Sequence, residues 1–328
     1  MNVDELGELL HLEDDLPGQL DAVVACIDAA LAAKDNGELV GPAHRVLDAG
    51  GKRLRPVLAL ASTVAAGFPV DEGVVAAAAC VELVHVGSLV HDDIMDHSQT
   101  RRGVPTVNAV EGPNTALLVG DYLLAIAGEL AAGVNASVAG ALATAIADLC
   151  DGQAVESCWL HDPDKPIDAY WRTLEGKTAA LLRTASSIGP LAAVAPPDLV
   201  ARMAEYGRCF GMAFQVIDDI LDLTSDEATM GKPVGHDIVE GVYTFPLLDY
   251  LAREDAGAIR GLLGPEMDAE AAAKVAAALL ASPCVDRARA EVLRFNAEAV
   301  AALDGLDHPV ARGLAELPQR YLEEMLGP

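Results

Sequence analysis

Apolar residues recur along the chain at the three-to-four-residue spacing of helices, and the two-residue alternation of half-buried strands is almost absent. Breaks that contain Gly and Pro, such as residues 67–69 and 189–190, separate these apolar segments. The clearest long helices are expected over residues 71–95 and 197–223. The pattern therefore predicts one all-α domain over residues 1–328 with about ten or more helices.

Composition supports a folded helical chain. Apolar residues make up 52% of the sequence, and aromatic residues only 4%, so the apolar share is mostly Ala, Leu and Val, of which Ala and Leu are strong helix formers. The net charge of −28 repels the phosphate backbone of nucleic acids and anionic membrane surfaces. Because the chain has so few cations, any cluster of Lys and Arg is conspicuous.

Cysteine usage and the N-terminal residues predict a cytoplasmic location. The six cysteines are scattered and form no C-x-x-C pair, which favours free thiols in the core over disulfides or a zinc site. Residues 1–15 are acidic and do not resemble a signal peptide. The longest apolar run, over about residues 134–146, is shorter than a membrane span, so no stable membrane insertion is expected.

The sharpest feature is a pair of D-D-x-x-D clusters, each close to the end of a predicted long helix. The first cluster contains Asp92, Asp93 and Asp96, and the second contains Asp218, Asp219 and Asp222. Carboxylates four residues apart share a helical face and repel one another, and Mg²⁺ is the natural counter-charge. A solvated acidic surface is the alternative for either cluster alone. The apolar stretches that precede both clusters favour a cavity instead.

The scarce cations lie beside glycines in short motifs. They are Lys52, Arg53 and Arg55 ahead of a predicted helix, Arg101 and Arg102 after the first acidic cluster, and Lys177 and Lys232. Arg and Lys side chains bind phosphate oxygens. Together with the acidic clusters, they predict a substrate that carries diphosphate and favour two such substrates. The apolar stretches predict a hydrocarbon tail.

These motifs together resemble the trans-polyprenyl diphosphate synthases of the polyprenyl synthetase family. The resemblance rests, in family order, on residues 51–56, 82–85, 92–96, 101–103, 120–121, 177–179, 215–222 and 231–232. It implies a single-domain isoprenoid-synthase helical bundle around a central cavity, with the motif-bearing core at about residues 50–245. It also implies a homodimer that elongates an allylic diphosphate with isopentenyl diphosphate.

The resemblance assigns a role to each matching residue. Those implied to bind metal, about three Mg²⁺ ions, are Asp92, Asp96 and Asp218, supported by Asp93, Asp219 and Asp222. Those implied to contact the allylic diphosphate are Arg101, Lys177 and Lys232, and Thr178 and Gln215 are expected close to the reacting centre. The implied isopentenyl diphosphate pocket consists of Lys52, Arg55, His85 and Arg102.

One departure from the family pattern concerns the allylic site. Val242 stands where the family usually has a lysine that faces the allylic diphosphate, and the chain ends without the Arg-rich tail common in the family. The missing cation is expected to weaken allylic binding, because ionised hydrogen bonds to phosphate are the strong ones.

Product length is predicted from a stripe of residues before Asp92. Gly87, Val84 and Cys80 share one face of the predicted helix, and family members that stop early commonly place an aromatic residue near this level. The stripe lacks one, which predicts products of about C20 or longer, with long chains favoured. Close helix packing is the alternative role for Gly87.

The sequence is also compatible with other functions. They are a geranylgeranyl or farnesyl diphosphate synthase, a terpene cyclase, and a weakly active partner subunit of a heterodimeric synthase.

Overall fold

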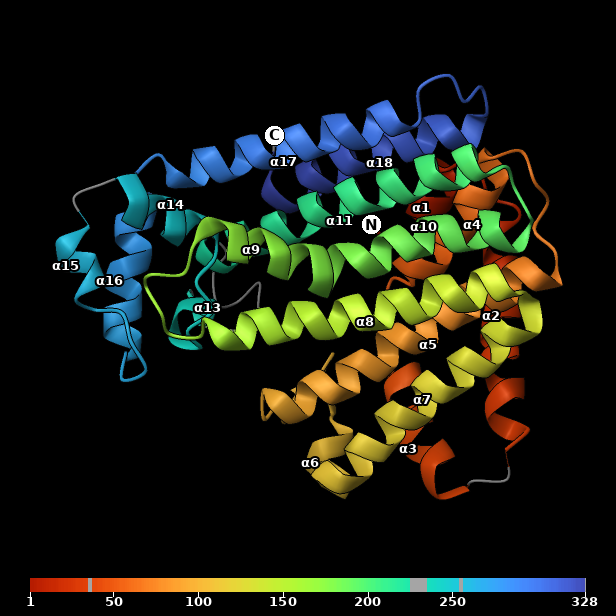
Figure 1. Ribbon diagram of the computed structural model, residues 1–328, viewed down its shortest axis with the longest axis horizontal. Coiled ribbons are helices and arrows are strands. Elements are labelled where there is room, and N and C mark those ends of the chain that lie inside the picture. Colours follow the sequence, from red (N-terminus) through yellow and green to blue (C-terminus); the bar gives the residue numbers. More distant parts are fainter. Residues whose placement is uncertain (35–36, 225–234, 254–255, 328) are drawn as a thin grey trace. The chain divides into compact units, whose positions relative to one another are not determined.

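The computed structural model describes residues 1–34, 37–224, 235–253 and 256–327, and the described chain is all-α, as predicted (Figure 1). Its first helices are α1 (Val3–Leu9), α2 (Leu16–Ala32), α3 (Gly37–Asp48), α4 (Leu54–Ala65), α5 (Glu72–Met95), α6 (Val107–Glu111), α7 (Pro113–Val134) and α8 (Ala136–Cys158). A short hairpin of β1 (Thr100–Arg101) and β2 (Val104–Pro105) connects α5 to α6.

The remaining helices follow without further strands in the described residues. They are α9 (Ile167–Leu174), the π-helical turn η1 (Glu175–Ala179), α10 (Ala180–Ala192), α11 (Pro197–Thr224), α13 (His236–Val239), α14 (Phe245–Arg253), α15 (Gly257–Arg260), α16 (Ala269–Leu280), α17 (Cys284–Ala302) and α18 (Pro309–Leu326). The long helices expected over residues 71–95 and 197–223 are confirmed as α5 and α11.

Local interactions determine where two of the long helices begin. The side chain of Asp71 caps α5 by accepting a hydrogen bond of 2.9 Å from the amide of Val74. Gly112, with a φ of 84°, turns the chain into α7, and Pro113 occupies the first turn of that helix, where its missing N–H costs nothing.

The chain divides into two compact units, each made of several stretches. Unit 1 contains Met1–Ile146, Leu181–Ala204 and Leu303–Ala315, and unit 2 contains Ala147–Ala180, Glu205–Ala302 and Glu316–Pro328. Unit 1 therefore carries the first acidic cluster and unit 2 carries the second. The organisation as one domain stays a prediction.

The core of unit 1 is built on α5, which lies side by side with α7 (Figure 1). Most α5 side chains between Val74 and Val90 are buried. Gly87 is a point of close approach: a Cβ there would lie 3.2 Å from the carbonyl oxygen of Gly120 and 3.4 Å from Cβ of Leu123. The tight packing of these helices fixes the direction in which the end of α5 presents its aspartates.

Aromatic side chains pack the core of unit 2. Trp171 on α9 lies 4.8 Å from Tyr170, 5.4 Å from Phe245 on α14 and 5.7 Å from Phe295 on α17, measured between ring centroids. A second group joins α11 to α18, where Phe214 stacks on Tyr321 with centroids 4.9 Å apart. These contacts hold α9, which precedes η1 and its Lys177, and α11, which carries the second acidic cluster.

The structure changes one expectation about the cysteines. All six are free, as predicted, but Cys150 and Cys158 on α8 are exposed and not in the core. Three described helices, α5, α7 and α8, are long and apolar enough to cross a membrane, although the sequence has no single uninterrupted run of that length. In α5, 67% of the apolar window is buried within the protein, so much of its hydropathy serves the core. The absence of membrane insertion stays a prediction.

Candidate active site

The first acidic cluster divides into one buried and two more accessible carboxylates. Asp93 is 2% exposed, and its Oδ1 accepts a 2.7 Å hydrogen bond from Nε of Arg101. Burial raises the pKa of Asp93, while Arg101 opposes that rise. Asp92 is half-buried and Asp96 is exposed at the end of α5, so these two are accessible to a cation from solvent. Arg101, expected on the allylic diphosphate, is the partner of Asp93 here.

The hairpin after α5 positions the paired arginines. Thr100 pairs with Pro105 and Arg101 with Val104 in antiparallel register. Its turn is formed by Arg102, with a φ of 51°, and Gly103, with a φ of 78°, the double positive-φ geometry that suits a two-residue hairpin. The guanidinium of Arg102 donates a hydrogen bond to the carbonyl of Gly50.

Glycines ahead of α4 admit the Arg102 side chain. Gly51 has a φ of 142°, and a Cβ there would lie 2.7 Å from Nη1 of Arg102, so a larger residue would displace the guanidinium. Arg53, with a φ of 50°, donates to Oε1 of Glu82 at 3.1 Å and to the Leu47 carbonyl at 3.0 Å. The Arg102 contact thus joins Gly50 to the hairpin, and Arg53 joins the same segment to α5.

The predicted isopentenyl diphosphate residues therefore gather in unit 1. Burial, and then the positive charges of Arg55, Arg102, Arg101 and Arg53, hold the pKa of His85 well below its usual range, so its imidazole is neutral. Burial lowers the pKa of Arg55 to about 10, and its buried Nε has no hydrogen-bond partner among the described residues. A buried, unsatisfied guanidinium N–H beside other cations suits an anionic phosphate oxygen. Lys52 precedes them on the exposed segment.

The chain-length stripe lies on the buried face of α5. Cys80 and Val84 are fully buried, and burial raises the pKa of the Cys80 thiol to about 12. The contacts of Gly87 with α7 support the alternative of close helix packing. Its role in product length stays a prediction.

In unit 2 a chain of hydrogen bonds connects Thr178 to the second acidic cluster. Thr178 Oγ1 donates to Oε1 of Gln215 at 2.7 Å, and Gln215 Nε2 donates to Oδ1 of Asp219 at 3.2 Å. The hydroxyl of Tyr170 donates to Oδ2 of Asp219 at 2.6 Å. Asp219 is 2% exposed, and burial raises its pKa to about 8 against the lowering effect of these two donors. Thr178 and Gln215 are thus brought together with Asp219, and their place beside the reacting centre stays a prediction.

A fourth acidic residue, Asp237, joins this cluster. Its amide donates to the two carboxylate oxygens of Asp222 at 3.4 and 3.3 Å, and its charge contributes to the raised pKa of Asp219. Asp218 is half-buried, and burial of the Tyr321 phenol, followed by the charge of Asp218, raises the pKa of Tyr321. Asp237 lies outside the D-D-x-x-D spacing, so the motif did not indicate it.

The π-helical turn η1 presents Lys177 and Thr178. Lys177 Nζ lies 2.5 Å from Oε1 of Glu156 on α8, a partner that the motif did not indicate. Two glycines permit the close approach of α8 and η1. A Cβ on Gly152 would lie 2.5 Å from the amide nitrogen of Lys177, and a Cβ on Gly176 would lie 2.6 Å from the carbonyl oxygen of Asp148. The turn is therefore held against α8 through its backbone.

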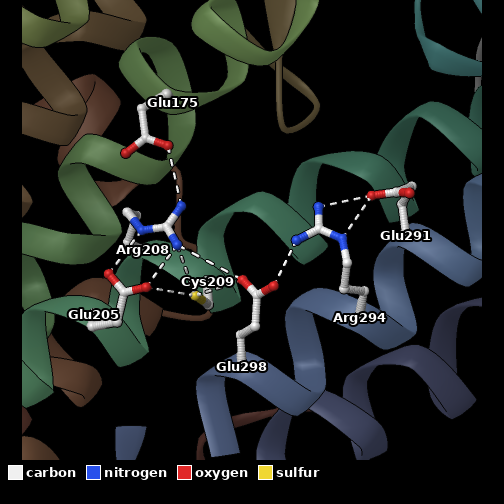
Figure 2. Close-up of polar contacts among 7 residues, drawn as sticks. All are labelled: Glu175, Glu205, Arg208, Cys209, Glu291, Arg294 and Glu298. Atoms are coloured by element: carbon white, nitrogen blue, oxygen red, sulfur yellow. Dashed lines mark hydrogen bonds and ion pairs between the residues drawn. The ribbon is translucent and has the colours of Figure 1, made fainter. Parts of the chain in front are cut away.

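A second network holds the start of η1 (Figure 2). Arg208 on α11 donates to Glu175 at 3.3 Å and to Glu205 at 2.7 Å, and it lies 3.8 Å from Glu298 on α17. Glu298 also accepts from Arg294 at 2.7 Å. Glu205 is the largest cause that raises the pKa of Arg208, so this guanidinium stays charged.

The carboxylates fit Mg²⁺ as shared ligands and not as a closed protein cage. Among the described residues, no group of three or more His, Cys, Asp or Glu side chains could by itself hold a metal ion. Mg²⁺ usually binds one or two carboxylates together with substrate phosphate oxygens and waters. The accessible pair Asp92 and Asp96 suits this mode, whereas Asp93 and Asp219 are buried and bonded to protein donors.

Two positions of the predicted allylic site provide no described cation. Lys232 lies outside the described residues. Val242 is half-buried, and its amide donates to the carbonyl of Asp237 at 2.8 Å. Beside it lies Lys165, a buried lysine in no motif, whose Nζ donates to the carbonyl of Tyr243 at 3.1 Å.

Known proteins are similar to this chain over most of its length. The polyprenyl synthetase family matches residues 36–280. The chain is 36% identical to heptaprenyl diphosphate synthase component 2 of Geobacillus stearothermophilus, over 91% of this chain and 93% of that protein. It is 37% identical to nonaprenyl diphosphate synthase of Mycobacterium tuberculosis, over 83% of this chain and 82% of that protein.

Solved structures are similar over nearly the whole length. The decaprenyl diphosphate synthase of Rhodobacter capsulatus aligns with a TM-score of 0.90 at 30% identity and covers 98% of this chain and 99% of its own. The polyprenyl synthase of Caulobacter crescentus, complexed with calcium and isoprenyl diphosphate, aligns with a TM-score of 0.88 at 28% identity over 99% and 98%. The fold is thus that of the isoprenoid synthases, and the family uses a divalent metal. The chain belongs to the polyprenyl synthetase family and is a trans-prenyl diphosphate synthase, a prenyltransferase.

Proposed function

We propose that this synthase is Mg²⁺-dependent and makes polyprenyl diphosphates of geranylgeranyl length or longer, with longer chains favoured. The observation that carries this proposal is the relation to heptaprenyl and nonaprenyl diphosphate synthases over 91% and 83% of the chain. A geranylgeranyl or farnesyl diphosphate synthase is the alternative within the same family.

The reaction follows from charge separation in the allylic substrate. The allylic C–O bond breaks, pyrophosphate departs with the electron pair, and the allylic cation is attacked by the double bond of isopentenyl diphosphate. A proton is then lost to the released pyrophosphate, so no side-chain base is required. About three bound Mg²⁺ ions would supply electrostatic stabilisation of the departing pyrophosphate. Asp92, Asp96 and Asp218 are the aspartates we assign to hold them.

The residues of unit 1 suit isopentenyl diphosphate. Arg55, Arg102 and Lys52 provide cations for its diphosphate, and the neutral imidazole of His85 provides a hydrogen-bond donor without a further charge. In unit 2, Lys177 provides a cation for the allylic diphosphate, and Thr178 and Gln215 are held by their mutual hydrogen bond. Lys232 and Arg101 keep the allylic role that the motifs give them.

A cavity in unit 1 supports a long product. It has a volume of about 560 Å³ and lies at the N-terminal end of α5, where Gly73 and Ala76 line it. These two residues continue the face that carries Cys80, Val84 and Gly87, since each step is three or four residues. From Asp92 to Gly73 the helix axis runs roughly 28 Å, which accommodates several isoprenyl units.

Product analysis tests this function. Purified protein with Mg²⁺, isopentenyl diphosphate and a dimethylallyl, geranyl or farnesyl primer should give products longer than farnesyl diphosphate by mass spectrometry. Farnesyl diphosphate as the end product would contradict the long-chain assignment. Absence of any condensation with all three primers would contradict independent catalysis.

A second candidate is one component of a two-component synthase. The printed name of the Geobacillus relative, component 2, favours it. Retention of all six motif aspartates favours an active chain. Turnover by the purified chain alone separates the two candidates.

We also propose a cytoplasmic homodimer. Leu117 and Leu118 on α7 are 51% and 55% exposed, an apolar surface that a second copy can cover. Free thiols at all six cysteines suit a reducing compartment. Light scattering of the purified chain, with Leu118→Glu as the disrupting variant, tests the dimer.

A further inference from the structure

Lys165 is a buried lysine with an unusual set of partners. It lies between α8 and α9, is 6% exposed, and donates to the carbonyl oxygen of Tyr243 at 3.1 Å. Its Nζ lies 5.8 Å from the centre of the Tyr170 ring. Within the described residues, no carboxylate lies within ion-pair distance of this ammonium, whereas Lys177 has Glu156. Burial of a charge without an anionic partner lowers the stability of the folded protein. The position of Lys165 therefore indicates a functional role.

The surroundings of Lys165 belong to the allylic half of the site. Tyr170, under its ammonium, donates to Asp219 of the second acidic cluster. Burial and the charge of Lys177 lower the pKa of Lys165, and Glu156 and Asp219 oppose that shift. Lys165 is therefore within electrostatic range of Asp219 and of the cation assigned to the allylic diphosphate.

Lys165 also lies next to the position that departs from the family pattern. Its hydrogen-bond acceptor, Tyr243, directly follows Val242, and His161 from the same segment donates its amide to the Gly241 carbonyl at 2.9 Å. Gly241, with a φ of 78°, permits this contact, since a Cβ there would overlap the His161 ring. The segment thus brings a lysine to the backbone of the residue that follows Val242.

We propose that Lys165 supplies to the allylic diphosphate the positive charge that Val242 does not. Its four-carbon stem is flexible, so the ammonium can exchange the neutral Tyr243 carbonyl for a phosphate oxygen when the substrate binds. This assignment rests on the proposed function, and it concerns binding of the allylic substrate and not of isopentenyl diphosphate.

The first experiment removes the charge and keeps a donor for Tyr243. In Lys165→Gln, calorimetry with inorganic pyrophosphate and Mg²⁺ should show affinity weakened about tenfold, and KM for the allylic substrate should rise about tenfold. KM for isopentenyl diphosphate should stay within about twofold. Lys165→Arg should retain pyrophosphate binding. Should the Gln variant not fold, Lys165→Met removes the same charge with a side chain that suits burial.

The second experiment moves the charge to residue 242. In the Lys165→Gln background, Val242→Lys should restore pyrophosphate affinity and the allylic KM. In the native background it should change both by less than about twofold, so the effects of the two substitutions should not add. Lys274→Gln is the matched control, because Lys274 is an exposed lysine of the same unit that pairs with Glu270 at 2.8 Å, and it should change neither quantity.

Three results decide the matter. Unchanged pyrophosphate affinity in Lys165→Gln would overturn the assignment. A lower melting temperature with an equal rise of both KM values, and no recovery with Val242→Lys, would also overturn it and identify Lys165 as a structural anchor. Pyrophosphate binding that depends on Lys165 in a chain that forms no prenyl product would support the assignment and overturn the proposed function.

Discussion

The hydroxyl of Tyr170 donates a 2.6 Å hydrogen bond to Oδ2 of Asp219, a residue 49 positions later in the chain. The Tyr170 bond holds the buried Asp219 carboxyl in one orientation. In that orientation its Oδ1 accepts the hydrogen bond from Nε2 of Gln215, which fixes the Gln215 amide. The amide oxygen of Gln215 is then the acceptor for Thr178. One phenol thus sets the orientation of three side chains close to the proposed reacting centre.

Tyr170→Phe should therefore lower kcat about tenfold and cost about 1–3 kcal/mol of unfolding free energy, because a buried carboxyl oxygen loses its donor. Tyr122→Phe is the control, since the bond from the Tyr122 hydroxyl to the Leu31 carbonyl is long, at 3.4 Å. Steady-state kinetics and urea unfolding of both variants measure the difference. Equal effects of the two substitutions would refute the special role of Tyr170.

Asp92→Ala and Asp218→Ala should each remove most turnover while the fold stays intact. Each substitution relieves repulsion between carboxylates on one helical face near the negative end of a helix dipole, so the melting temperature should not fall. Turnover with saturating Mg²⁺ and circular dichroism measure the two effects. Asp21→Ala, on the exposed surface of α2, should change neither. Undiminished turnover in either site variant would exclude that aspartate as a metal ligand.

Gly152→Ala should lower activity at least tenfold, because its Cβ would lie 2.5 Å from the Lys177 amide and push η1 away from α8. Gly140→Ala, on the same helix, is the matched control. A Cβ there meets nothing within 4 Å, so the substitution should stabilise the protein by about 0.5–1 kcal/mol. Kinetics and thermal unfolding of both variants test the close approach, and a fully active Gly152→Ala would disprove it.

His85 should make the protein less stable in acid. The folded protein keeps His85 neutral because burial and the neighbouring arginines hold its pKa well below the usual range, whereas the unfolded chain takes up a proton near pH 6.5. The unfolded state thus binds more protons below pH 6.5, and stability falls as the pH drops. From pH 6.5 to 5.5 the loss from this group is about 1 kcal/mol. Urea unfolding of His85→Gln should lack that loss, while His11→Asn, at an exposed histidine, should keep it.

Two substitutions on α5 separate the tunnel from the packing interpretation of Gly87. If the stripe lines the product path, Gly87→Phe should shorten the products toward about C15–C20, and Cys80→Phe, about 10 Å deeper, should shorten them less. If Gly87 serves only the approach to Gly120, Gly87→Phe should instead lower the melting temperature and the total activity without a graded change in length. Mass spectrometry of the products distinguishes these results.

The fold was largely predictable because the Ala- and Leu-rich periodicity marks helices locally. Asp71 and the Gly–Pro breaks gave the bounds of α5 within one residue, and α11 was equally clear. The exposure of Cys150 and Cys158 was not predictable, since α8 has small apolar residues on all sides and no pronounced polar face.

The site was predictable only where its residues lie in short motifs. The aspartates, Lys177 and Thr178 have fixed local spacing. Tyr170 and Lys165 act through partners 49 and 78 residues away, and such contacts leave no pattern in a single sequence. Glu156 was missed for the same reason, because it pairs with Lys177 across 21 residues.

The π-helical turn has a consequence for helical register. Tyr170 and Thr178 are eight residues apart, and in a regular α-helix that separation rotates two side chains roughly 80° away from each other. Both nevertheless reach residues of α11 that are one turn apart, Asp219 and Gln215. The wider turn at Glu175–Ala179 absorbs part of that rotation and brings the two hydroxyls toward one face. In a regular α-helix the two residues would share a face only at about seven positions apart, so the wider turn accommodates one extra residue without separating the two hydroxyl groups.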